Sequence, residues 1–367
     1  MTMNNKTKHP IMPFAAAVLL AAVTALTACG KGGRTLPSAT GSIYECVVVT
    51  NNTPYSAIAE VMAADMPCLP QMESFFTLSH VEQPAFDDFL KSARNVLIAD
   101  TDSGRYTQVK ARFSRDNWSK PQAVCRIQAP DTASFGAWWR ENGTAVREWF
   151  VREELARQGR FLRGGTNRQA REALQKSMGC DILVPEDYMV VKDSAGLLWC
   201  CNSKGPVRRD LVIYSYPYTD SLAFTQEHLC RKRDEVFGRL VSGAVQGSYM
   251  GTEYRHFPPQ MRYIRPLRHS PTSQTSPTSP TISSSPSIQP SAPSFYASEV
   301  RGLWRLYGGE AMGGPFVSHS RLDCVNGRVV TAEVFVYAAG QKKRNALRQA
   351  EAILYTLRLP EEQPFEK

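Results

Sequence analysis

Sixteen residues near the N-terminus most constrain this chain, because they decide which residues are left to fold and in which compartment. Residues 14–29 read FAAAVLLAAVTALTAC, after a short leader whose only charged side chains are Lys6 and Lys8. A basic leader, a short apolar run and a small-residue cleavage site are the three parts of an export signal. The apolar run is about 15 residues long, whereas a helix that spans a bilayer needs about 20. We therefore predict that residues 1–28 are a cleaved signal peptide rather than an uncut transmembrane anchor.

The last four residues of this segment have the pattern of a lipobox, at which bacterial lipoprotein signal peptidase cleaves before a diacylglyceryl-modified cysteine. They read Leu26-Thr27-Ala28-Cys29, so we predict Cys29 as the lipid attachment residue and the first residue of the mature chain. Residues 30–34 contain no acidic sorting signal. These observations predict a protein held at the membrane by its lipid, in the outer membrane and facing the periplasm. Export also excludes nucleic acid as a partner.

The charge and length of the mature chain place only weak limits on the kind of partner it binds and on the number of its domains. Removing the signal peptide takes away two lysines and no acid, so the formal net charge falls from +9 to +7. A basic surface favours anionic headgroups or an anionic polymer, and an ordinary solvated surface is the alternative. The remaining chain of roughly 340 residues exceeds one ordinary domain. The hydrophobic content of the whole sequence, 43%, is enough for one large core or two smaller ones.

Eight further cysteines are scattered along the chain, at 46, 68, 125, 180, 200, 201, 230 and 324. An even number in an exported protein permits disulfides. Most of them lie in apolar, strand-like runs, where cysteine often packs as a small buried side chain. No C-x-x-C motif and no Cys/His cluster with zinc spacing is present, so we expect no metal site and no cofactor. We predict mostly buried thiols, with room for one or two disulfides.

Strand and helix signals alternate after a predicted flexible tether at residues 29–43, through an N-terminal half (44–160) and a C-terminal half (161–359). The first strand signal is the β-branched run YECVVVT at 44–50, and a long amphipathic helix is expected at 132–158. Aromatic side chains recur on one face of that helix at spacings of three and four, which favours packing on a sheet over a ligand box. The residues on this face are Phe135, Trp138, Trp139, Val146, Trp149 and Phe150.

Strand pairs closed by helices predict an α+β fold with mainly antiparallel sheets packed by amphipathic helices. The runs RNVLIA at 94–99 and RDLVIY at 209–214 begin alike, so the two halves could be degenerate repeats. Asn326-Gly327 predicts a hairpin turn between strands at 316–322 and 329–337. Further strands are expected at 74–81, 95–99, 109–113, 123–129, 181–184, 188–191, 197–200, 211–216 and 303–307, and further helices at 54–66, 87–93, 166–178, 224–240 and 342–357.

Residues 269–294 differ in kind from the rest of the chain. Of these 26 residues, 20 are Ser, Thr or Pro. Such a segment cannot bury enough apolar surface to offset the entropy lost on ordering. We therefore predict a disordered insertion within the C-terminal half.

Seven short segments, taken in order, carry a resemblance to a known family. They are LPQMESF at 69–75, RN at 94–95, PQ at 121–122, YPY at 216–218, GSYMGT at 247–252, RGLW at 301–304 and MGGPFVSH at 312–319. Together they resemble an uncharacterised family of Bacteroidetes lipoproteins known only as a domain of unknown function, DUF4837. The resemblance runs from about residue 44 to 359, and the insertion and the cysteines depart from the family pattern. It implies an envelope lipoprotein and supplies no catalytic residues.

The segments on either side of the insertion could converge into a contact surface. Gly313-Gly314-Pro315 predicts a turn, because glycine accepts left-handed backbone angles without strain. That turn would lead into a strand on which Ser318 and His319 alternate faces. The candidate surface consists of Ser248, Tyr249, Arg301, Trp304, Gly313, Gly314 and His319.

A serine beside a histidine also permits a hydrolase interpretation. His319 would be the base, with Ser248 or Ser318 as nucleophile and Glu253 or Asp323 as orienting acid. Adjacent Ser318 and His319 point to opposite faces of a strand, and no G-x-S-x-G sequence is present. We therefore favour a protein that binds or scaffolds an envelope component, either a protein or an anionic polymer. The alternative is a hydrolase of envelope polymer or acyl groups centred on His319.

A basic stretch follows the aromatic helix, formed by Arg152, Arg157, Arg160, Arg163, Arg168 and Arg171. It could face anionic headgroups near the anchor. The interpretation we prefer is a solvated helix end, balanced by Glu148, Glu153, Glu154 and Glu172.

Overall fold

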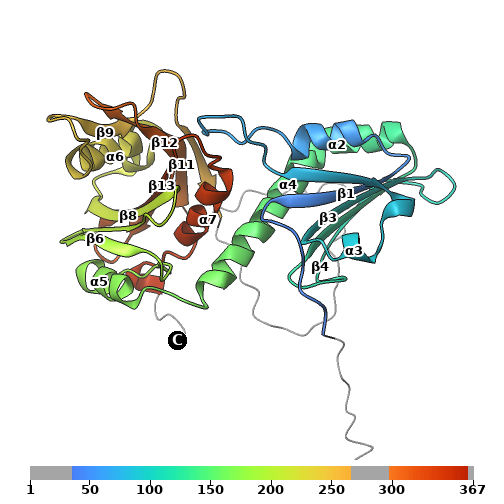
Figure 1. Cartoon of the computed structure of the whole chain (residues 1–367), viewed down its shortest axis with the longest axis horizontal. Helices are drawn as coiled ribbons and strands as arrows, with labels where there is room; N and C mark the ends of the chain where they lie inside the picture. Colours follow the sequence, from blue (N-terminus) through green and yellow to red (C-terminus); the bar gives the residue numbers. More distant parts are fainter. Residues whose placement is uncertain (1–34, 266–296, 363–367) are drawn as a thin grey trace, which may run out of the picture.

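The computed structural model describes residues 35–265 and 297–362. The predicted signal peptide, Cys29 and the predicted insertion at 269–294 lie outside these residues. Within them, two sheets lie on either side of the long helix α4 (Thr132–Leu162) (Figure 1). None of the helices in the described ranges is both long and apolar enough to cross a membrane.

The N-terminal sheet has five strands in the order β2-β1-β3-β5-β4. β1 pairs in parallel with β2 and β3, β3 pairs in parallel with β5, and only β4 is antiparallel to its neighbour. Helices α2 (Tyr55–Met62) and α4 cover one face, while η1 (Gln83–Ala85) and α3 (Asp88–Lys91) adjoin the other. The strands are β1 (Glu45–Asn51), β2 (Thr77–Glu82), β3 (Asn95–Thr101), β4 (Lys110–Arg115) and β5 (Ala123–Ala129).

The C-terminal sheet has eight strands, all antiparallel, in the order β10-β11-β12-β13-β8-β7-β6, with β9 paired to β11. Helix α6 (Gln226–Leu240) packs on one face, and α5 (Arg168–Met178) and α7 (Arg344–Leu354) pack on the other. The strands are β6 (Met189–Ser194), β7 (Leu197–Asn202), β8 (Arg208–Pro217), β9 (Tyr249–Thr252), β10 (Gln260–Ile264), β11 (Ala297–Tyr307), β12 (Gly313–Asp323) and β13 (Arg328–Tyr337). The remaining described elements are η2 (Ser221–Phe224) and η3 (Pro360–Glu362).

The predicted α+β fold is confirmed, and its mainly antiparallel character holds for the described chain as a whole. Eight of the eleven strand pairings within the described ranges are antiparallel. The three parallel pairings gather in the N-terminal sheet, where longer connections such as the one through α2 carry the chain back to the same edge. Because the two sheets differ in strand order and direction, the topology gives no support to degenerate repeats.

The aromatic face of α4 packs in the core, as the spacing predicts. Phe135, Trp139, Val146 and Phe150 are buried in one hydrophobic cluster that also contains residues of both sheets and of α7. The two halves therefore share a continuous core around α4 and α7, which keeps the junction between the sheets closely packed.

The two glycine motifs predicted as turns behave differently. Asn326-Gly327 does join β12 to β13, and Gly327 has a left-handed φ of 59°. The turn predicted at Gly313-Gly314 is wrong, since both residues lie inside β12 opposite β11. A Cβ atom on Gly314 would collide with the carbonyl oxygen of Val336, so this glycine is required by a close approach of strands.

Three further expectations differ from the structure. Residues 181–184 form only an isolated bridge, between Asp181 and Arg358, and β9 and β10 were not anticipated. In the predicted tether, Ser38 and Thr40 already pair with the N-terminal sheet region. All eight described cysteines are free thiols, so the expected disulfides are not formed. Six of these cysteines are buried, Cys68 is partly buried and Cys324 is exposed.

Candidate binding site at the junction of the two sheets

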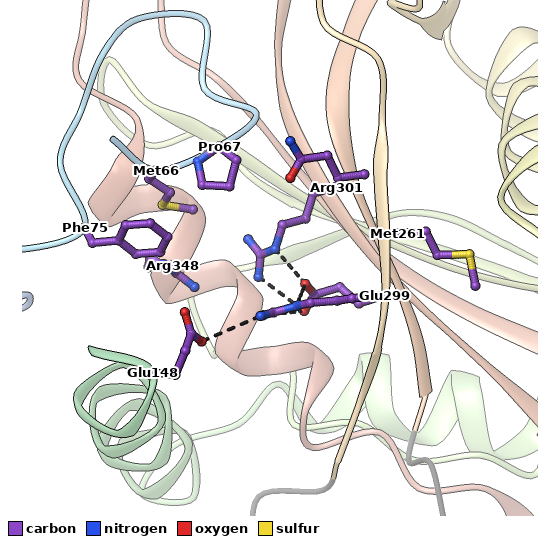
Figure 2. A pocket seen from close by; sticks show the side chains of 10 residues that line it. Met66, Pro67, Phe75, Glu148, Met261, Glu299, Arg301 and Arg348 are labelled. Atoms are coloured by element: carbon purple, nitrogen blue, oxygen red, sulfur yellow. Dashed lines mark hydrogen bonds and ion pairs between the residues drawn. The ribbon is translucent and has the colours of Figure 1, made fainter. Parts of the chain in front are cut away.

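A pocket of about 120 Å³, partly open to solvent, lies where the two halves of the protein meet (Figure 2). One wall comes from the segment after α2 and from α4, and the other from β10, β11 and α7. Its lining residues are Met66, Pro67, Phe75, Glu148, Gln260, Met261, Arg262, Glu299, Arg301 and Arg348. The pocket thus combines an apolar side with a group of charged side chains.

The N-terminal wall is held in place by a helix cap donated across the junction. Helix α7 has no capping side chain of its own at Lys343. Instead, the carboxylate of Glu73 accepts hydrogen bonds from the backbone N–H groups of Lys343 at 2.6 Å and Arg344 at 3.0 Å. The Arg344 side chain donates in return to the carbonyl oxygen of Ser74 at 2.8 Å. A negative charge at this position satisfies unpaired N–H groups and complements the helix dipole, so it fixes the loop on α7.

Arg301 is the central charged residue of the pocket. It lies two residues after Glu299 on β11, so the two side chains share a face, and it donates to that carboxylate from Nε at 2.7 Å and from Nη2 at 3.2 Å. Nη2 also bonds Glu351 of α7. Arg301 is only 6% exposed, and its Nη1 is buried with no hydrogen-bond partner. One donor of this guanidinium is therefore left over in the wall of the pocket.

Glu299 joins several charged groups around the same cavity. It accepts from Arg262 Nε at 2.7 Å, and His319 Nε2 lies 3.4 Å from its other oxygen. Arg262 in turn reaches across the junction to Glu148 of α4 at 3.6 Å (Figure 2). Burial alone would raise the pKa of Glu299, but Arg301, His319 and Arg262 hold it well below its ordinary value. Glu299 is therefore a carboxylate at neutral pH.

Positive charge slightly exceeds negative charge around the cavity. Arg348 binds Glu351 at 3.0 Å, and its guanidinium lies 5.5 Å from the centroid of the Phe75 ring. The guanidinium of Arg147 lies over the same ring, 4.0 Å from its centroid. The charged side chains are Arg147, Arg262, Arg301 and Arg348 against Glu148, Glu299 and Glu351. Such a site can bind an acidic group next to an apolar stem. No group of three or more His, Cys, Asp or Glu residues that could hold a metal ion occurs in the described part of the chain.

Comparison with known proteins identifies the family but no activity. Residues 167–356, more than half of the chain, match the family described as "Domain of unknown function (DUF4837)". The chain belongs to the DUF4837 family. The resemblance predicted from the sequence motifs is therefore confirmed. Residues 39–163 match a second domain of unknown function, DUF8532.

Other comparisons add little to this assignment. No curated protein matches the chain. Among solved structures, the human StarD13 (DLC2) lipid transfer and protein localization domain is similar at 10% identity, with 53% of this chain and 94% of that chain covered. Its TM-score is 0.17, so this likeness has no bearing on the fold or the ligand.

In this DUF4837 protein, the seven residues of the predicted contact surface do not share one face of the C-terminal sheet. Arg301 and His319 face α7, whereas Trp304 packs on the opposite face, where its Nε1 donates to the Val336 carbonyl at 3.3 Å. Gly313 and Gly314 pair with the backbone of β11.

Ser248 and Tyr249 lie apart from the pocket, near the end of α6. Ser248 Oγ donates to the carbonyl of Val245 at 2.5 Å and accepts from the N–H of Gly243 at 2.9 Å. Tyr249 is about half exposed and stacks on Tyr307 with ring centroids 5.5 Å apart. Of the predicted surface, only Arg301 lines the pocket, with His319 beside it through Glu299. Trp304 and Gly314 are cross-strand neighbours away from the pocket.

The residues weighed for a hydrolase each engage other partners. His319 is fully buried, with its ring perpendicular to that of Tyr355 at a centroid distance of 4.7 Å, and it lies beside Glu299. Ser318 faces the other side of the sheet, opposite Glu333 of β13. Ser248, Glu253 and Asp323 bond respectively to Val245, Arg305 and Arg328. This arrangement places none of these groups in a relay with His319.

Sequence reasoning missed most of the pocket. Glu148, Arg262, Glu299, Arg348 and Glu351 were not proposed as site residues. Two local signals could have indicated them. Arg348 and Glu351 interrupt the apolar face of the last helix three residues apart, and Glu299 precedes Arg301 by two residues in a strand. Buried charges of opposite sign at such spacings predict an internal ion-pair network.

Proposed function

We propose that this protein is a lipid-anchored component of the cell envelope that binds an acidic group of another envelope component in the junction pocket. In this proposal, the lipid is attached at Cys29, and the body faces the periplasm from the outer membrane. The lipobox pattern at residues 26–29 and the preceding apolar run support the anchor. The pocket supports the binding role.

The observation that carries the binding role is the unpartnered Nη1 of Arg301. A buried N–H group without an acceptor destabilises a protein by roughly 1–3 kcal/mol. A carboxylate or phosphate oxygen of a ligand would supply the acceptor and would offset the excess positive charge around the cavity. Arginine is well suited to both groups because its donors are fixed in a planar fork.

The size of the pocket limits what can enter. The pocket volume of about 120 Å³ is well below the roughly 300–1,000 Å³ of pockets that enclose drug-sized ligands. It admits one acidic terminus or side group, whose stem would pack on Met66, Phe75 and Met261, but not the body of a polymer. The ligand is therefore one carboxylate or phosphate group carried by an envelope protein or an anionic polymer.

Site-specific photocrosslinking in intact cells tests the binding role. A photoreactive residue at the exposed pocket residue Gln260 should form a reproducible adduct, and the same residue at exposed Lys204 should not. Arg262→Gln should weaken the adduct. Its matched control is Arg305→Gln, since the two side chains are 47% and 48% exposed and each forms an ion pair with a buried glutamate. Equal adducts at 260 and 204, or none at 260, would refute the binding role.

Small probe molecules can distinguish whether the acidic group is a phosphate or a carboxylate. Inorganic phosphate and propionate are added separately to the purified protein, and the thermal unfolding midpoint is followed. A rise with only one of them assigns the acidic group to that class. A rise with neither, at concentrations up to saturation of solubility, argues against an acidic ligand.

The anchor has its own test, which does not depend on the pocket. Intact-protein mass of the material purified from membranes should correspond to a chain that begins at Cys29 and carries acyl chains. Cys29→Ala should leave an unacylated protein that retains the leader. An unmodified cysteine in the wild-type protein would overturn the anchor and leave the pocket proposal intact.

A further inference from the structure

The C-terminal end of α4 presents an exposed aromatic residue between two exposed arginines. Phe161 is 80% exposed, and it is flanked in sequence by Arg160 and Arg163. Arg152 lies more than two turns earlier and is also exposed, on the side of the helix that Arg163 occupies and about half a turn round the helix from Phe161. In the described ranges, neither Arg160 nor Arg163 forms an ion pair. We call Arg152, Arg160, Phe161 and Arg163 the α4 tip.

The glutamates expected to balance these arginines are used elsewhere. Glu153 is buried and binds Arg115 at 2.5 and 2.8 Å, and Glu154 is buried between Arg94 at 2.9 Å and Arg157 at 2.6 Å. The other two also have partners, since Glu148 pairs with Arg147 and Arg262, and Glu172 pairs with Arg168. The preferred sequence interpretation, a solvated helix end with balanced charge, therefore does not describe the α4 tip.

The α4 tip lies at the end of the molecule where the chain enters the fold. Lys120 pairs with the entering chain at Ser38, and the carbonyl of Thr40 accepts from the N–H of Arg94 at 3.0 Å. The guanidinium of Arg94 then binds Glu154 in the last third of α4. From Glu154 to Phe161 the helix rises about 10 Å, at 1.5 Å per residue. Figure 1 shows the entering segment and the lower end of α4 on the same side of the body.

The length of chain before the fold limits how far the membrane can be. Nine residues separate Cys29 from Ser38. A fully extended chain spans at most about 3.3–3.6 Å per residue, so these nine cover about 30 Å. If Cys29 carries the lipid, the bilayer surface lies within that distance of the entry point. The α4 tip can then reach it.

We propose that the α4 tip docks on the anionic headgroups of the bilayer that holds the lipid anchor. This inference rests on the anchor in the proposed function. Each arginine near an anionic leaflet favours contact by roughly fivefold, and Phe161 can enter the headgroup region with its apolar ring. Docking at the tip would point α4 toward the membrane. Glu148 of the pocket would then stand about 20 Å above the tip, at 1.5 Å per residue, open to the periplasm.

Hydrogen exchange on the acylated full-length mature protein tests this docking. The protein is bound to vesicles of phosphatidylcholine alone or with one part in three of phosphatidylglycerol. Amides around residues 158–166 should exchange several-fold more slowly on the anionic vesicles, and the protection should fade in high salt because the charges are screened. Arg160→Glu with Arg163→Glu, or Phe161→Ser alone, should remove the protection.

Matched controls separate docking from general surface effects. Phe89→Ser changes a phenylalanine that is 76% exposed on α3 and should leave the exchange at 158–166 unchanged. Arg231→Glu with Arg239→Glu removes two exposed arginines from α6 and should also have no effect. Equal loss of protection in these variants would overturn docking at the α4 tip.

The result distinguishes failure of docking from failure of the anchor. Intact mass first establishes whether the protein is acylated. Acylated protein on anionic vesicles with no protection at 158–166 overturns the inference and leaves the anchor standing. Unacylated protein refutes the anchor, and it is then mixed with anionic vesicles at low salt. Protection of the α4 tip there still supports headgroup binding, and its absence overturns it.

Discussion

Two arginines, Arg233 and Arg301, are buried on opposite faces of the C-terminal sheet. They differ in whether the nitrogen Nη1 of the guanidinium has a hydrogen-bond partner. Arg233 of α6 donates to Glu333 from Nε at 3.0 Å and from Nη2 at 2.8 Å, and its Nη1 donates to Thr252 at 3.1 Å. The ring of Phe316 lies 3.9 Å from this guanidinium. Arg301 has equally close carboxylates, yet its Nη1 has no partner and it lines a cavity.

The difference indicates different roles for two groups of the same chemistry. A buried arginine whose donors are all satisfied and whose face is covered by a ring holds the fold together. A buried arginine with one donor left over beside a cavity can take an acceptor from outside. We call the first group the Arg233 cluster and the second the Arg301 cluster.

The largest expected effect comes from breaking the Arg233 cluster. Arg233→Met leaves the carboxylate of Glu333 buried without its partner, so the free energy of unfolding should fall by about 3–5 kcal/mol. Urea unfolding at about pH 8, where Glu333 is ionised, measures it. Binding of phosphate or propionate at the pocket should not change. A loss below about 1 kcal/mol would show that the cluster is not structural.

The two clusters should also differ in how stability depends on pH. Burial raises the pKa of Glu333 to about 7, although Arg233 opposes this shift. The folded protein therefore holds this proton more tightly than the unfolded chain, whose pKa is 4.5, and stability declines as pH rises from 4.5 to about 7. The pKa of Glu299 is held well below 4.5. Its stabilising contribution is complete above pH 4.5 and is lost as pH falls below that value.

Urea unfolding across about pH 3 to 8 should separate these contributions, each with a slope of at most ~1.4 kcal/mol per pH unit. Glu333→Gln should flatten the decline between pH 4.5 and 7. Glu299→Gln should instead reduce the loss of stability that occurs as pH falls below 4.5. If both variants changed the same limb of the profile, the opposite shifts inferred for the two carboxyl groups would be wrong.

A smaller loss of stability is expected when the contact between the N-terminal half and α7, the helix that carries Glu351 of the Arg301 cluster, is removed. Glu73→Ala removes the cap of α7, which carries Glu351, and should lower the free energy of unfolding by about 2 kcal/mol. Exposed Glu60 on α2 is the matched control, and Glu60→Ala should change stability by less than about 0.5 kcal/mol. Thermal unfolding of the two variants provides the measurement. Equal losses would mean that the cap across the junction contributes nothing specific.

Sequence patterns predicted the parts of this molecule that depend on local spacing. The aromatic helix, the β5 strand at Ala123–Ala129 and the Asn326-Gly327 turn all follow from side chains within a few residues of one another. The Gly313-Gly314 motif was misread because a glycine can serve either a turn or a close approach of strands. Which of the two applies depends on Val336, a residue on another strand.

The pocket could not be predicted because its walls come from distant parts of the chain. Phe75, Glu148 and Arg262 meet only after the two halves pack around α4. Arg301 was proposed as part of a sequence motif. Its candidate role, however, rests on Nη1, which is left without a partner because Glu299 and Glu351 bind the other two nitrogens. Hydrogen-bond satisfaction is a property of the packed structure, and no sequence period encodes it.

The smallest expected effect tests the unpartnered nitrogen itself. Arg301→Lys keeps the positive charge but removes the planar fork that presents Nη1 to the pocket. At a free probe concentration of about four times Kd, phosphate or propionate should stabilise the wild-type protein by about 1 kcal/mol. This shift should disappear in Arg301→Lys and persist in Arg233→Lys, although the latter is itself destabilised. Should Arg301→Lys fail to fold, Arg262→Gln provides a milder change on the same wall, with a partial loss expected. An undiminished shift in both pocket variants would mean that the probe binds elsewhere and that the unpartnered donor of Arg301 is not a binding group.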